Sequence, residues 1–172
     1  CLDNDTAVAI SKAFINKYID LEHTRTICVG SIVNSGFSTF KDNQIVSPES
    51  VSGNYDPHNM SFCGVLWKTV DHSLSEMVED SNEKDSWMYR KVSASWEIGF
   101  NEYKIVRGSR NLNQAEIISD PKEVDRLSKY LVCEGGSGFD DTNTEVYRLI
   151  SGTVVPLGMG LVRNPAAAVN GV

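Results

Sequence analysis

A strand-like stretch in mid-chain places a hydroxyl and a carboxylate where they could act together. In "KVSASWEIGF", Ser95 and Glu97 are two residues apart, and the alternation of side chains along a strand puts them on one face. The opposite face carries large apolar side chains that are expected to pack in the core: Trp96, Ile98 and Phe100. The polar face is either solvated or lines a catalytic groove. Because serine is a weak nucleophile at its free pKa, the second interpretation needs a base within about 3 Å.

Among the histidines, His23 is the best candidate for that base. It ends the apolar strand pattern "YIDLEH" and is expected on the strand face that also carries Ile19 and Leu21. The alternative is a structural histidine with no catalytic role. His58 lies in a turn-rich segment and is expected to be exposed, and His72 lies at a helix start, where capping explains it.

The third member of such a site is less determined by the sequence. Glu97 could orient His23, or it could form a structural pair with a lysine or arginine. Glu102, Asp140 and Asp141 are further candidates for the third member. Glu22 is next to His23 and is expected on the opposite strand face. An oxyanion hole needs backbone N–H groups, and the "GGSG" glycines Gly135, Gly136 and Gly138 could supply them. Their alternative role is to end a helix and form a turn.

Other motifs and the composition exclude several classes of protein. No GxSxG or SxxK motif is present, which argues against α/β-hydrolases and penicillin-binding enzymes. The net charge of -7 argues against a nucleic-acid binder, and no apolar run approaches the ~20 residues of a membrane span. The four cysteines show no metal-binding spacing and are expected to be free and buried: Cys1, Cys28, Cys63 and Cys133. No metal and no cofactor are implied.

The remaining pattern predicts mixed strands and a few helices. Helices are expected at 5–18, 71–86 and 120–132, and strands within 18–33, 61–70, 88–106 and 146–162. The segment 38–60 is expected to be a surface excursion with one short edge strand, and 133–145 a glycine-rich loop. We therefore predict one α+β domain over residues 1–172, with a mainly antiparallel bent sheet or β-barrel flanked by a few helices. Residues 164–172 are expected to form a tail.

Four segments, in this order, resemble the capsid-maturation (prohead) serine proteases of tailed bacteriophages: "DLEH", "SASWEIGF", "LSKYLVCEGGSG" and "GMGLVRNPAAAV". Members of that family have an "xWEH"-like histidine strand, a "VSMExxF" serine strand, a "LxKxLxxxGGSG" segment and a closing "GxGLVxxPANP". The resemblance spans residues 23–169. It implies that Ser95 is the nucleophile, that His23 is the general base and that Glu97 is the carboxylate of the serine strand.

The resemblance also implies a fold and a biological role. The fold would be similar to herpesvirus assemblins. The protein would be a self-cleaving, homo-oligomeric endopeptidase inside the phage procapsid, in the host cytoplasm, with scaffold and major capsid proteins as substrates. Trp96 and Ala167 depart from the family pattern, and the segment before His23 is short, so an upstream segment is expected to be missing. The alternatives are an inactive capsid-assembly module of the same fold and a plain binding module.

Overall fold

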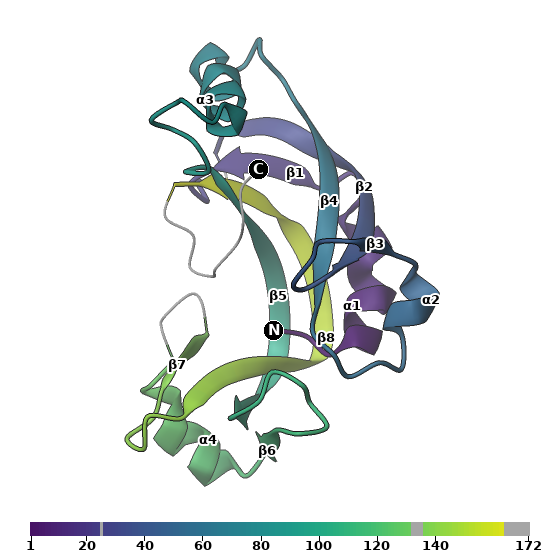
Figure 1. Ribbon diagram of the computed structural model, residues 1–172, viewed down its shortest axis with the longest axis vertical. Helices are drawn as coiled ribbons and strands as arrows, with labels where there is room; N and C mark the ends of the chain where they lie inside the picture. The colour runs from purple at the N-terminus through teal and green to yellow at the C-terminus, as the bar shows by residue number, and fades with distance from the viewer. Residues whose placement is uncertain (25, 132–135, 164–172) are drawn as a thin grey trace. The chain divides into compact units, whose positions relative to one another are not determined.

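The computed structural model describes residues 1–24, 26–131 and 136–163 (Figure 1). In this part of the chain there are four α-helices and one 3₁₀ helix: α1 (Asn4–Ser11), η1 (Lys12–Phe14), α2 (Pro48–Val51), α3 (His72–Asn82) and α4 (Pro121–Ser128). The strands are β1 (Tyr18–Leu21), β2 (Cys28–Thr39), β3 (Ile45–Val46), β4 (His58–Leu66), β5 (Ser93–Arg107), β6 (Glu116–Ile118), β7 (Ser137–Phe139) and β8 (Glu145–Val162).

The strands form a mixed, open sheet, and the predicted α+β class is confirmed. The sheet order is β3-β2-β1-β8-β5-β6, with β4 paired to β2 and β7 paired to β8. β1 pairs with β8 in parallel, whereas β2 runs antiparallel to β1 and to β3. β6 runs antiparallel to β5, and β7 runs antiparallel to β8. Within the described residues the sheet does not close into a barrel.

The chain divides into two compact units, and neither is a continuous piece of chain. The first unit consists of residues 1–12, 36–61 and 99–155, and the second of 13–35, 62–98 and 156–172. β2, β4, β5 and β8 contribute residues to both units. His23, Ser95 and Glu97 all belong to the second unit.

In the second unit, the parallel pairing of β1 with β8 separates an apolar face from a polar one. Ile19 is in register with Met159, and Leu21 with Leu161, and three of these four side chains are buried: Ile19, Met159 and Leu161. On the other face, Tyr18 and Asp20 are in register with Gly158 and Gly160. Because side chains alternate along a strand, one β1 face packs in the core and the other carries polar groups over glycines.

In the first unit, α4 is capped as its sequence predicts. The Asp120 side chain accepts hydrogen bonds from the backbone N–H groups of Lys122 and Glu123, and Pro121 occupies the first turn. Leu127 of α4 packs in a cluster with Ile105 and Val146. Burying such apolar side chains supplies most of the stabilisation of a helix this short.

Several predicted elements differ in extent from those observed. β2 continues to Thr39, beyond the predicted end at residue 33, while α2, β6 and β7 were not predicted. His58 begins β4 and is half-buried, where an exposed turn residue was expected. Its Nδ1 lies 2.8 Å from the Asp56 carbonyl oxygen. The start of β4 and the strands β6 and β7 lie in segments rich in turn-forming residues, so the local sequence does not indicate them. They form because they pair with β2, β5 and β8, respectively.

Among the described cysteines, Cys1, Cys28 and Cys63 are free, but all three are exposed, so the expected burial was wrong. Cys133 lies outside the described residues. No helix in the described part of the chain has the length and apolar character needed to cross a membrane.

Candidate active site

His23 lies in a tight turn after β1, and the prediction that it lies on the strand itself was wrong. The strand ends at Leu21, and the Thr24 N–H donates back to the Leu21 carbonyl across 3.1 Å. Glu22 and His23 both have positive φ, at 51° and 56°, which is the pattern of a type I′ turn. Positive φ is uncommon outside glycine, although His tolerates it better than most residues. The turn therefore removes His23 from the period-two alternation of β1.

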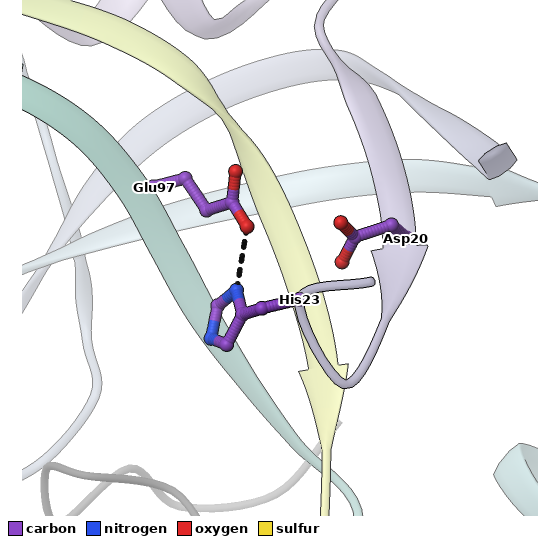
Figure 2. A group of neighbouring side chains, drawn as sticks. All are labelled: Asp20, His23 and Glu97. Atoms are coloured by element: carbon purple, nitrogen blue, oxygen red, sulfur yellow. Dashed lines mark hydrogen bonds and ion pairs between the residues drawn. The ribbon is translucent and has the colours of Figure 1, made fainter. Parts of the chain in front are cut away.

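Glu97 of β5 contacts the His23 imidazole directly. The Nδ1 atom of His23 lies 2.7 Å from Oε1 of Glu97 (Figure 2). An ionised carboxylate only accepts hydrogen bonds, so in this pair Nδ1 carries the proton and Nε2 is the nitrogen left to act as a base. The Glu97 side chain is 5% exposed, whereas that of His23 is 32% exposed. The buried acid therefore holds an imidazole that is still partly exposed to solvent.

Tyr18 of β1 contacts the other oxygen of the same carboxylate. Its hydroxyl donates to Oε2 of Glu97 across 2.6 Å. Hydrogen bonds to an ionised acceptor are short and roughly twice as strong as neutral ones. Tyr18 was not among the predicted site residues.

Two glycines of β8 make room for these side chains. A Cβ on Gly158 would lie 2.6 Å from the nearest Tyr18 ring atom, and a Cβ on Gly160 would lie 2.7 Å from His23 Nδ1. Such contacts are closer than carbon atoms tolerate. The motif "GMG" thus has a physical reason, because Tyr18 and His23 lie against backbone that must have no side chain.

Asp20 is a second buried carboxylate at this site, and the sequence reasoning missed it. It has no exposed surface. One ligand atom each from Asp20, His23 and Glu97 lie within 4.8 Å of one another. In Figure 2 Glu97 extends from β5 and Asp20 from β1, and β8 runs between these two strands. One imidazole and two carboxylates are also a donor set that suits divalent cations. The sequence feature that could have indicated Asp20 is "YID", in which an acidic residue interrupts an apolar strand pattern.

Ser95 lies on the polar face of β5 with Glu97, and this face is more buried than expected. Ser95 and Trp96 are half-buried, Ser93 and Glu97 are buried, and Phe100 is 39% exposed. The expectation that Phe100 packs in the core was therefore wrong. Within the described part of the chain no hydrogen bond joins Ser95 to His23. Catalytic hydrogen bonds often tighten only when substrate binds.

Glu22 has a contact of its own, away from the imidazole. Its Oε1 accepts from the backbone N–H of Arg163 across 3.1 Å and lies 3.3 Å from Nε of the same arginine. The Glu22 N–H also donates to the Leu161 carbonyl. These bonds hold the turn against the end of β8.

Two of the three glycines predicted to form an oxyanion hole, Gly136 and Gly138, have structural explanations in the first unit. Gly135 lies outside the described residues. Gly136 has a φ of 60°, and its carbonyl accepts from the Arg148 N–H. A Cβ on Gly138 would overlap the Tyr130 carbonyl oxygen. Close backbone packing thus accounts for Gly138, and the oxyanion role stays a prediction.

Comparison with protein-family models, curated proteins and solved structures finds no match for this chain.

Proposed function

We propose that this protein is a serine endopeptidase with Ser95 as nucleophile, His23 as general base and Glu97 as the residue that orients the histidine. The observation that carries the proposal is the 2.7 Å contact between His23 Nδ1 and Glu97 Oε1. The strand that supplies Glu97 presents the Ser95 hydroxyl on the same face. A carboxylate, an imidazole and a hydroxyl of this kind form the catalytic constellation of many unrelated serine hydrolases.

In the proposed reaction, His23 Nε2 takes the Ser95 Oγ proton as Oγ attacks the carbonyl carbon of a peptide bond. The imidazolium then gives that proton to the leaving amine, which leaves an acyl-enzyme. A water molecule attacks the ester, again losing its proton to Nε2, and the imidazolium then returns a proton to Ser95 Oγ as the acid product leaves. Glu97 stabilises the imidazolium throughout and keeps the proton on Nδ1.

The biological setting of the proposal rests on the resemblance to prohead proteases. In that setting the enzyme works as a homo-oligomer in the procapsid interior, in the host cytoplasm. It cleaves scaffold proteins, major capsid proteins and itself, on a fold similar to herpesvirus proteases. The buried Glu97–His23 pair and the strand-borne serine support this setting, since both follow the order of the family's motifs.

The test compares wild type with Ser95→Ala, each expressed from the full-length open reading frame, by intact mass over time. Loss of a serine nucleophile costs about 10⁶-fold in rate, so self-cleavage should stop in Ser95→Ala. Ser137→Ala is the matched control, because it removes a half-buried hydroxyl in β7. Labelling of wild type by a fluorophosphonate, with the label mapped to Ser95, gives a second readout.

Two outcomes would overturn the proposal. Equal cleavage by wild type and Ser95→Ala would assign the activity to another group. Activity that is lost in EDTA and restored by a divalent cation would instead favour a metal held by Asp20, His23 and Glu97.

An inactive capsid-assembly module is the second candidate function. The missing hydrogen bond between Ser95 and His23 among the described residues favours it. It predicts that wild type neither cleaves itself nor reacts with the fluorophosphonate, even at high protein concentration.

A further inference from the structure

The Glu97 carboxylate is held from two sides by different elements. Oε1 faces Nδ1 of His23 at 2.7 Å, and Oε2 accepts from the Tyr18 hydroxyl at 2.6 Å. Two short bonds on opposite oxygens fix the rotation of the carboxylate plane. An acid in this position can hold an imidazole in one tautomer only if its own orientation is fixed.

The Tyr18 ring lies against a glycine of the neighbouring strand. Tyr18 is in register with Gly158 on the parallel neighbour β8. A Cβ at Gly158 would lie 2.6, 2.8 and 2.9 Å from three Tyr18 ring atoms. The ring therefore packs directly on the Gly158 backbone. This packing restricts the ring and directs its hydroxyl towards Glu97.

We propose that Tyr18 is a positioning residue of the active site, which acts through Glu97 to keep the His23 proton on Nδ1 and Nε2 free as the base. Its hydroxyl stabilises the ionised carboxylate and fixes the oxygen that His23 contacts. In this role Tyr18 acts through its hydrogen bond to Glu97. The inference rests on the proposed serine-protease function for its kinetic consequence, but not for its structural one.

The first experiment records ¹⁵N-detected tautomer populations of His23 and its Nδ1–H proton by NMR, in wild type and in Tyr18→Phe. The phenylalanine keeps the ring against Gly158 and removes only the hydroxyl. We expect wild-type His23 to be mainly the Nδ1–H tautomer, with a downfield and exchange-protected proton. In Tyr18→Phe the population should shift towards Nε2–H and the proton should move upfield. Unchanged spectra would overturn the inference.

Tyr147→Phe is the matched control. Tyr147 is a buried tyrosine, whereas Tyr18 is half-buried, and the Tyr147 hydroxyl donates to the Ser109 carbonyl in the first unit. Its loss should lower thermal stability about as much as Tyr18→Phe without changing the His23 spectrum. A His23 change in both variants would indicate general loosening and would contradict a specific role for Tyr18.

The kinetic arm uses self-cleavage or a peptide substrate. Loss of an outer partner of a functional histidine costs about 10–100-fold at metal sites, and we expect a fall of that size in kcat for Tyr18→Phe, with KM unchanged. If Ser95→Ala is as active as wild type, the proposed function fails, while the NMR result still decides the role of Tyr18. If Ser95 is essential but the His23 NMR spectrum is the same in wild type and Tyr18→Phe, only the positioning inference fails.

A second variant tests the inference even if Tyr18→Phe does not fold. Incorporation of 3-fluorotyrosine at position 18 keeps the ring and hydroxyl and makes the hydroxyl a stronger donor. The His23 Nδ1–H resonance should then move in response, although no contact to the imidazole has changed. An unmoved resonance in a folded protein would overturn the inference.

Discussion

At the scale of single residues, the His23 turn places two successive non-glycine residues at positive φ. Each such residue costs on the order of 1–3 kcal/mol unless its surroundings hold it. Here Glu97 binds the imidazole, and Glu22 binds the end of β8 at Arg163. These contacts offset the strain and hold His23 where the strand alone could not place it.

Glu97→Gln should lower kcat about 10⁴-fold, as expected when an orienting acid is replaced by its amide and the histidine takes the wrong tautomer. KM should stay the same, because Glu97 lies behind the imidazole. Steady-state kinetics on a peptide substrate would measure both. Glu102→Gln is the control, since it alters an exposed carboxylate of the same strand. Equal losses in both variants would contradict an orienting role for Glu97.

Gly160→Ala should displace the imidazole. The new methyl group would lie 2.7 and 2.8 Å from two His23 ring atoms, and a misplacement of about 1 Å in a catalytic group can cost about 10²-fold in rate. Gly36→Ala in β2 is the matched control, because a Cβ there meets nothing within 4 Å. Cleavage rates and circular dichroism together would separate displacement from unfolding. Full activity of folded Gly160→Ala would refute the close approach.

At the scale of elements, the site depends on which strands become neighbours. Tyr18 and Asp20 on β1 face Gly158 and Gly160 on β8, although about 140 residues of chain separate them. The parallel pairing requires a long crossover, and the intervening chain provides the β5 strand with Ser95 and Glu97. The site is thus assembled from pairings that bring distant segments together.

Helix α4 offers a direct test of local sequence signals. Asp120→Ala removes the side chain that accepts from two backbone N–H groups, and it should lower the free energy of unfolding by about 1 kcal/mol. Urea denaturation followed by circular dichroism would measure the change. Asp125→Ala, an exposed substitution in the same helix, should have little effect. A similar loss in both variants would show that Asp120 does not act as a cap.

At the scale of the whole molecule, acid should destabilise the fold partly through Asp140. The Arg107 guanidinium, with Thr142, holds the pKa of Asp140 well below its ordinary 3.8. A depressed pKa means that the folded state favours the ionised form, so this stabilisation is full above pH 3.8 and is lost as the pH falls below it. The melting temperature of Asp140→Asn should therefore change less with pH than that of wild type between about pH 4 and pH 2.

The control for this effect is the neighbouring Asp141→Asn, because Asp141 is exposed. Its melting temperature should keep the wild-type dependence on pH. If Asp140→Asn also kept that dependence, the ion pair with Arg107 would not contribute to acid stability.

Local patterns in the sequence were sufficient for the class of fold and for the features that depend on nearby residues. The helices expected at 71–86 and 120–132 are present in shorter form as α3 and α4, and Asp71 and Asp120 cap them. Such local features can be predicted, because a cap acts within three residues of itself. The pairing of Ser95 with Glu97 on one strand face followed from alternation alone. The α+β class followed from the order of helical and strand patterns.

The tertiary structure alone decided the contact between Glu97 and His23, the participation of Tyr18 and Asp20, and the burial of the polar face of β5. The sequence left the role of Glu97 open, and the other features were not predicted from it. Each of them joins segments that are more than 70 residues apart or depends on the turn after β1. Alternation predicts that two side chains share a face of their own strand, but it does not state what covers that face. Whether a polar face meets water or a histidine is settled by which strands pair, and the sheet register fixed that choice here.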